Sequence, residues 1–163
     1  MCIRDRSVTP LHKQKVNVRT KLSGNAESHS RTLLRSRDLI DVSDEPEVRG
    51  GTNEGFAPTE MALGALIACS NVITHKIAAK NGIEIDELDF DLDAQFNRLG
   101  VTLQEEVMVP FPEILLNINM TTNASDEQIE ILKSDLDKYC PVAKVFSQSG
   151  SKIITEWSIK RPA

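Results

Sequence analysis

The chain has 163 residues, of which 40% are hydrophobic and only 4% aromatic, and its formal net charge at pH 7 is −5. This length and composition predict a globular protein with a mostly aliphatic core rather than a disordered chain. The negative charge and the scarcity of aromatic side chains argue against a surface that binds nucleic acid.

The start of the chain differs in character from the rest. It contains no apolar secretory core, and residues 1–6 show neither periodicity nor a capping signal. We expect residues 1–10 to be a non-native or disordered leader, exclude Cys2 from the chemistry, and assign residues 11–163 to a single domain. No apolar run reaches the roughly 18 residues that a membrane span needs. We therefore expect a cytoplasmic protein without membrane contact, in a compartment where a disulfide would be transient and catalytic.

Short strands and turns are predicted for the first third of the chain. Alternating residues predict a strand over 15–22, and Ser23-Gly24-Asn25 predicts the turn after it. The chain would return through 31–34 and form a third short strand over 37–42. Residues 44–55 are rich in glycine, proline and acids, which predicts a loop.

One long helix is predicted next. Pro58 suits its first position, and Asn81-Gly82 marks its end. Apolar residues cover several of its faces, so we expect most of it to be buried. Four small residues would allow another helix to approach closely: Ala62, Gly64, Ala65 and Ala68.

The second half of the chain mixes strands and helices. Alternation predicts strands over 88–96, 114–120 and 153–159. Residues 125–128 form a capping box that begins a second helix. Its apolar face ends at Cys140, and Pro141 forces a break before a short helical piece that reaches 147. The order of three strands, helix, two strands, helix and strand predicts an α+β fold.

Cys69, in the long helix, and Cys140, at the break before Pro141, are the candidate functional residues. A buried cysteine most often only fills the core. Two thiols that folding brings together can instead be oxidised by one substrate and reduced by another. The residues alone leave both interpretations open.

No metal or cofactor site is expected. The three histidines, His12, His29 and His75, do not cluster, and the spacing from Cys69 to His75 matches no established metal site. The acids of 86–93 alternate along a strand face, which is typical of a solvated surface.

Several motifs, in their order along the chain, resemble those of the OsmC/Ohr family of osmotically induced and organic hydroperoxide resistance proteins. They are Asp44-Glu-Pro46, Gly50-Gly51, Ala57-Pro58-Thr-Glu60, the helix segment 63–69 and Cys140-Pro141-Val142. The resemblance covers about residues 16–159. It implies an intertwined homodimer in which antiparallel sheets wrap around central helices and the active sites lie at the subunit interface.

The resemblance also implies a thiol-dependent peroxidase. Cys69 would be oxidised by an organic hydroperoxide to a sulfenic acid, and Cys140 would resolve it as a disulfide. A dithiol reductant, such as a lipoyl-bearing protein, would then restore the thiols. By ungapped spacing from Cys69, Arg49 occupies the position of the family's arginine, whereas Thr59 stands at the position of its glutamate.

Peroxide attack requires a thiolate, and a cysteine with an ordinary pKa is only about 3% ionised at pH 7. Burial in the middle of a helix would raise the pKa of Cys69, so a nearby cation is needed. Arg49 is the favoured source, ahead of Arg31 and Arg37. Thr59 offers that arginine only a hydroxyl, so we expect Arg49 to be less firmly oriented than beside a carboxylate.

A second interpretation is a non-catalytic module of the same fold that binds a small apolar ligand between the central helices. The replacement of the family's glutamate by Thr59 favours it. A third is a different thiol-based conversion at the same pocket. Loss of turnover on Cys69→Ser would identify the enzyme, whereas a binding module would keep its ligand affinity.

Overall fold

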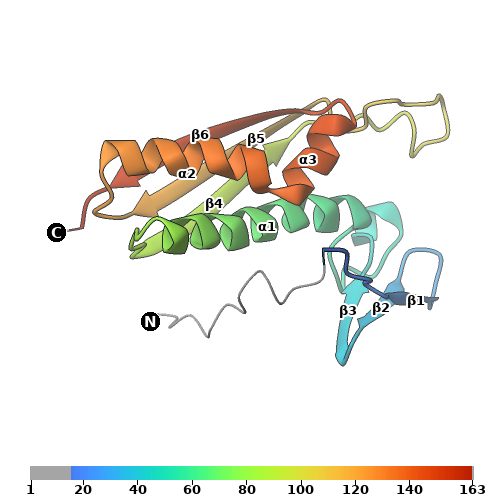
Figure 1. Cartoon of the computed structure of the whole chain (residues 1–163). Coiled ribbons are helices and arrows are strands. Elements are labelled where there is room, and N and C mark those ends of the chain that lie inside the picture. Colours follow the sequence, from blue (N-terminus) through green and yellow to red (C-terminus); the bar gives the residue numbers. More distant parts are fainter. Residues whose placement is uncertain (1–15, 163) are drawn as a thin grey trace. The chain divides into compact units, whose positions relative to one another are not determined.

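The structure, a computed structural model, describes residues 16–162. It divides the chain after Met61 into two compact units, each with its own internal contacts. The described residues form two three-stranded sheets and three α-helices (Figure 1), which confirms the predicted α+β class. The predicted leader lies outside the described residues, and the assignment of 11–163 to a single domain stays a prediction.

The first unit contains an antiparallel sheet in the order β1-β2-β3, formed by β1 (Ser23–Ala26), β2 (Thr32–Ser36) and β3 (Leu39–Ser43). The predicted strand over 15–22 is wrong for its described part, which pairs with no strand among the described residues and leaves Val16 98% exposed. The turn follows β1 instead, where Ser28 Oγ accepts the N–H groups of Ser30 and Arg31. The second and third predicted strands are confirmed with slightly later bounds.

The predicted loop after β3 is confirmed, and one buried carboxylate holds it together. Asp44 is fully buried and accepts the N–H groups of Glu45, Thr52 and Glu54 at 2.8, 3.0 and 3.3 Å, and Thr52 Oγ1 at 2.6 Å. The Thr52 hydroxyl, helped by the backbone N–H groups of Glu54 and Thr52, holds the pKa of Asp44 well below its usual range although burial opposes the charge. A Cβ at Gly51 would lie 1.8 Å from the carbonyl oxygen of Glu45, so only glycine fits this approach.

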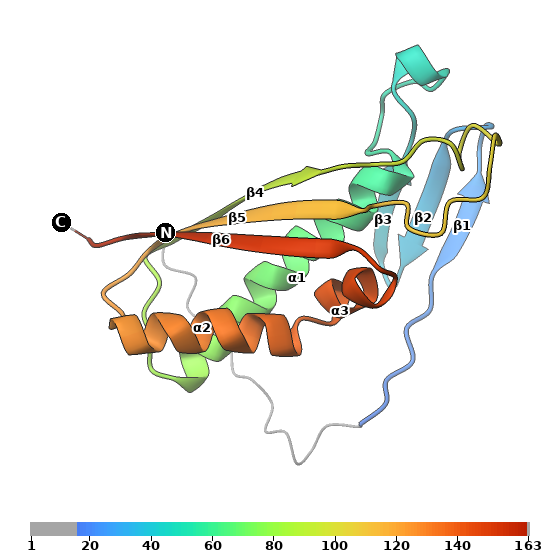
Figure 2. The same cartoon turned by 90° about the horizontal axis from the view of Figure 1, so that it is seen from above.

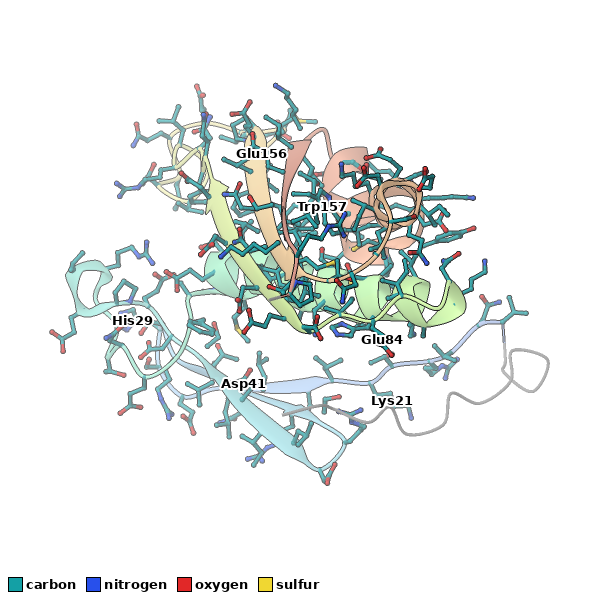
Figure 3. The ribbon with its side chains drawn as sticks, turned by 90° about the vertical axis from the view of Figure 1, so that its left-hand side faces the viewer. Lys21, His29, Asp41, Glu84, Glu156 and Trp157 are labelled. Carbon is teal, nitrogen blue, oxygen red and sulfur yellow. The ribbon has the colours of Figure 1, made fainter. Side chains whose placement is uncertain are left out.

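The second unit contains a sheet in the order β4-β5-β6, with β4 at Glu87–Ala94, β5 at Glu113–Thr121 and β6 at Lys152–Lys160, close to the predicted strands. β5 is antiparallel to β4 and parallel to β6, and Ile118 at its centre pairs with Phe90 and Trp157. The parallel pairing requires a crossover, which α2 (Asp126–Tyr139) and α3 (Pro141–Gln148) provide (Figure 2). Successive strand residues point to opposite faces, so Trp157 packs toward the core whereas exposed Glu156 points away (Figure 3).

Three helices pack against that core-facing side of the sheet: α1 (Pro58–Lys80), most of which belongs to the second unit, α2 and α3. The predicted helix ends are confirmed. Ser125 and Gln128 form the capping box of α2. α1 ends before Gly82, whose φ of 64° stops the helix. The core between helices and sheet is aliphatic, and its most buried members are Leu66, Ile114, Ile118, Met120 and Leu132.

α1 is apolar around most of its circumference but is buried on one side only. Its buried residues form one stripe at helical spacing: Leu66, Ser70, Thr74, Ile77 and Ala78. The opposite side exposes the small residues Gly64, Ala65 and Ala68 together with Val72, which is 48% exposed. The prediction that most of this helix is buried is therefore wrong for the single chain.

α1 is also, in the described part of the chain, the one helix that is long and apolar enough to cross a membrane, with a mean hydropathy of 1.4 over 18 residues. The expectation that no stretch of this length is so apolar is wrong. A helix in a protein core passes the same test, and the buried stripe of α1 packs against the sheet and α2.

Candidate thiol site

Cys69 lies in the middle of α1, at the border of the buried stripe, and is partly exposed. Leu66, one turn earlier, and Ser70, the next residue, both belong to that stripe. Because Cys69 is several turns from the start of α1, the unpaired N–H groups at that end cannot reach its sulfur. Any group that stabilises a Cys69 thiolate must therefore come from another element or from a long side chain of α1.

Cys140 lies at the junction of α2 and α3 and is fully buried. Its N–H donates to the carbonyl oxygen of Leu136 at 3.0 Å, and its own carbonyl accepts the N–H of Lys144 at 3.1 Å. Pro141 causes the break between the helices because its ring disfavours the helical conformation for the residue before it, and Cys140 has φ −70° and ψ 108°. The predicted break and short helix are confirmed.

The structure brings the two thiols together. Burial is the largest influence on the pKa of Cys69 and raises it, and the neighbouring thiol of Cys140 raises it further. The backbone N–H of Val142 and the charge of Lys76 lower it by less. No arginine among the described residues of the second unit contributes to the shift. Within this unit alone, Cys69 is therefore held mainly as the neutral thiol.

A cavity of about 280 Å³ lies beside the stripe of α1 that borders Cys69. Its lining comes from all three helices and two strands: Leu66, Ser70, Leu116, Leu136, Asp137, Ala143, Ser147, Ile153 and Thr155. Most of these side chains are aliphatic, and the polar atoms come from hydroxyls and one carboxylate. Partial burial raises the pKa of that carboxylate, Asp137. The volume is at the small end of the range for organic ligands.

Arg49 lies in the first unit, at the end of the 3-10 helix η2 (Glu47–Arg49), within the loop that Asp44 organises. Its Nε is 2.6 Å from Oε2 of Glu45, and the two side chains are 46% and 31% exposed. We expected Thr59 to leave Arg49 without a carboxylate, but Glu45, four residues earlier, provides one. The support of the Cys69 thiolate by Arg49 stays a prediction.

The two other candidate arginines also lie in the first unit. Arg31 Nε is 2.8 Å from Oε2 of Glu54, and the same guanidinium pairs with Glu27. Arg37 occupies the turn between β2 and β3 with a φ of 57°. Arg31 is thus paired with two carboxylates and Arg49 with one, so Arg49 remains favoured over Arg31.

Thr59 and Glu60 lie in the first turn of α1. Glu60 Oε2 accepts the N–H of Ala57 at 2.8 Å, which satisfies a donor just before the helix and places a negative charge at its positive end. Glu60 is therefore a capping residue, and Thr59 beside it is partly exposed.

Residues 16–162 contain no group of three or more His, Cys, Asp or Glu side chains arranged to hold a metal ion. His75 Nδ1 lies 3.0 Å from the carbonyl oxygen of Asn71, one turn earlier on α1. His29 is in the first unit, and His12 lies outside the described residues.

A family model described as OsmC-like protein matches residues 51–156, more than half of the chain. The chain belongs to the OsmC family. Solved structures of similar fold share little sequence with this OsmC-family chain. An OsmC-like protein from Mycoplasma pneumoniae has a TM-score of 0.71 at 17% identity, over 90% of this chain and 99% of that one. An organic hydroperoxide resistance protein from Elizabethkingia anophelis has a TM-score of 0.62 at 15% identity, over 91% and 100%.

A third structure of similar fold is the organic hydroperoxide resistance protein OhrB of Bacillus subtilis, with a TM-score of 0.53 at 18% identity over 88% and 98% of the two chains. No curated protein sequence matches the chain. The family and the OsmC/Ohr fold predicted from the motifs are thus confirmed, but the second sheet is mixed rather than antiparallel, because α2 and α3 cross over between β5 and β6. The intertwined homodimer stays a prediction.

Sequence reasoning missed three interactions of this OsmC-family chain: two that act on Cys69 in the second unit, and one that holds Arg49 in the first. The N–H of Val142 has no sequence signal, because it depends on where α3 packs. Lys76 and Glu45 do have one: Lys76 follows Cys69 by seven residues on the same helical face, and Glu45 precedes Arg49 by the four residues of an ion pair.

Proposed function

We propose that this OsmC-family protein is a thiol-dependent peroxidase that reduces organic hydroperoxides, with Cys69 as the attacking and Cys140 as the resolving thiol. The observation that supports this most is the adjacency of two free thiols that lie far apart in the sequence. Relatives of similar fold include proteins described as organic hydroperoxide resistance proteins.

The proposed reaction has two chemical steps. The Cys69 thiolate attacks the terminal oxygen of the hydroperoxide, the O–O bond breaks, and the organic fragment leaves as an alcohol after taking a proton. Cys69 is then a sulfenic acid. The Cys140 sulfur attacks the Cys69 sulfur, water leaves, and a disulfide forms. An external dithiol, which we propose to be a lipoyl-bearing protein, reduces the disulfide and is itself oxidised.

The first step needs a group that offsets the raised pKa of Cys69. We assign this role to Arg49, held by Glu45. A guanidinium about 4 Å from the sulfur would contribute on the order of 4 kcal/mol before desolvation, at an effective dielectric constant of about 20. A net gain of about 1.4–3 kcal/mol would lower the pKa by one to two units. In the proposed homodimer, the site lies at the interface between the two subunits.

A small-molecule-binding module is the second candidate function. Two observations favour it: the raised pKa of Cys69, and the cavity of about 280 Å³ beside α1, whose lining includes five aliphatic side chains. Such a module would bind a small apolar ligand without consuming it. We propose a cytoplasmic location for either function.

Turnover separates the two functions. We expect the wild type to consume cumene hydroperoxide with dihydrolipoamide as reductant, and Cys69→Ser to lose this activity. Cys140→Ser should still be oxidised once per site, because only the resolving step is removed. Equal turnover by Cys69→Ser and the wild type would contradict the proposal. A wild type without turnover, together with the same ligand affinity in Cys69→Ser and the wild type, would favour the binding module.

A further inference from the structure

The cavity of about 280 Å³ in the second unit stays open because several side chains that line it are small. Ser70 comes from α1, and Ala143 and Ser147 come from α3. Protein interiors are close-packed and contain few voids larger than a water molecule. A space of this size, left unfilled by three short side chains, therefore indicates a place for a ligand rather than a packing defect.

This cavity is apolar inside and polar at its mouth. Leu66, Leu116 and Leu136 line it and are 0, 2 and 3% exposed, so they form its inner part. Asp137 and Ser147 also line it but are exposed to solvent, so they mark its opening. Asp137 is on α2 and Ser147 on α3, two helices that meet at an angle (Figure 2). A ligand could therefore place a hydrocarbon chain inside and a polar group at the mouth.

The carboxylate at this mouth has no positive partner. Among residues 16–162, no lysine or arginine forms an ion pair with Asp137. The nearest lysines in the sequence interact elsewhere: Lys133 Nζ is 2.7 Å from Oε1 of Glu130, and Lys138 Nζ is 4.8 Å from the centre of the Tyr139 ring. Partial burial raises the pKa of Asp137 with no opposing charge. A cationic group of a ligand would supply the missing charge.

We propose that this cavity binds a short aliphatic amine in its protonated form, with the ammonium group at Asp137 and the hydrocarbon chain against the buried leucines. Burial of the chain supplies affinity, and the carboxylate selects the cation over a neutral or anionic head group. A short chain is expected because the volume is below that of pockets for drug-sized molecules. This goes beyond both proposed functions because it assigns the cavity a charged ligand.

Neither Cys69 nor Cys140 lines the cavity, so amine binding does not depend on the peroxidase chemistry. It would still be felt at Cys140. Leu136 and Ala143, which do line the cavity, lie four residues before and three residues after this fully buried cysteine. Alkylation of Cys140 requires local opening of the junction between α2 and α3. A ligand that contacts both helices stabilises the closed form and should slow this alkylation.

The first experiment is calorimetric titration of the reduced protein at pH 7, without hydroperoxide, with hexylamine, hexanol and hexanoate. We expect hexylamine to bind about tenfold more tightly than hexanol, as one charge-assisted hydrogen bond allows, and hexanoate to bind more weakly than either. Asp137→Asn should lower the affinity for hexylamine to that for hexanol and leave the affinity for hexanol unchanged.

The matched control is Asp135→Asn, which removes the same charge from α2 at a position that does not line the cavity. It should change neither affinity. The proposal would be overturned by a wild type that does not bind hexylamine, by equal affinities for hexylamine and hexanol, or by equal losses in the two asparagine variants.

A second pair of measurements locates the bound amine. Ala143→Leu fills the cavity from α3 and should abolish binding of hexylamine and hexanol alike. If this variant does not fold, the rate of Cys140 alkylation in the wild type decides: saturating hexylamine should slow it at least fivefold, and should slow it less in Asp137→Asn at the same concentration. Binding retained by folded Ala143→Leu, or an alkylation rate that bound hexylamine leaves unchanged, would overturn the proposal.

Discussion

Two regions of the molecule shift the pKa of an ionisable group in opposite directions. In the first unit, Asp44 is fully buried yet has a lowered pKa, because the Thr52 hydroxyl and the backbone N–H groups of Glu54 and Thr52 donate to it. In the second unit, Cys69 is less buried yet has a raised pKa, because burial and Cys140 outweigh Val142 and Lys76. The supply of donors, rather than depth alone, decides which group is ionised.

This difference gives the two regions different parts in the proposed chemistry. Hydrogen bonds to the Asp44 carboxylate hold together the loop from Asp44 to Glu54. This loop carries Arg49 together with its partner Glu45. The thiol region supplies the reacting atoms but too few donors to ionise Cys69. The proposed peroxidase chemistry would draw on both regions, and substitutions in each of them separate their contributions.

The largest expected effect comes from Asp44→Asn, which replaces an acceptor of four hydrogen bonds by a group that also donates. We expect the melting temperature to fall by about 5 °C or more, because buried donors lose their partner. The lowered pKa of Asp44 gives the sign of the pH dependence. Its contribution is complete above its unfolded pKa of about 3.9 and is lost as the pH falls through the folded value.

Thermal unfolding of Asp44→Asn between pH 3 and pH 8 provides the check, with the exposed Asp41→Asn as the control. The difference between wild type and Asp44→Asn should be full at pH 7 and shrink on acidification. A difference that grows toward low pH would show that the charge of Asp44 does not stabilise the loop.

A smaller effect is expected from Glu45→Gln, which leaves Arg49 in place but weakens its orientation. Peroxidase activity at pH 7 should fall about tenfold, because the pKa of Cys69 would rise by about one unit. The control is Glu47→Gln, an exposed neighbour on η2. Combining Glu45→Gln with Arg49→Gln should cost no more than Arg49→Gln alone, since both act through one guanidinium. Additive losses would contradict this pairing.

The smallest effect is expected from Lys76→Gln. Lys76 is exposed, so water and salt screen its action on Cys69. The alkylation midpoint of Cys69 should rise by about 0.3 pH unit at low salt and by nothing measurable at high salt. Lys80→Gln, one turn further along α1, should leave the midpoint unchanged. A shift that persists at high salt would mean that Lys76 contacts the sulfur directly.

The elements with a buried face could be predicted from the sequence. β4, β5 and β6 show their alternation because one side of the sheet packs on the core. The capping box at Ser125 and the break at Pro141 depend on local chemistry alone, and both are present. The strand predicted over 15–22 failed because alternation does not reveal whether a neighbouring strand exists to pair with it.

The candidate site could be predicted only in part. The motifs identify Cys69 and Cys140, but their adjacency and the donation from Val142 depend on how α3 packs on α1. The apolar sequence of α1 predicted burial on several sides, whereas a single chain buries only one stripe. The apolar faces that a helix could bury can be read from its sequence, but the faces that are buried depend on which elements pack against it.

The most direct test of the redox pair is to add one equivalent of cumene hydroperoxide to the reduced protein and map its peptides by mass. We expect a disulfide between Cys69 and Cys140, formed without any other oxidised residue and reversed by a dithiol. Recovery of both cysteines as free thiols, or over-oxidation of Cys69 with Cys140 untouched, would contradict it.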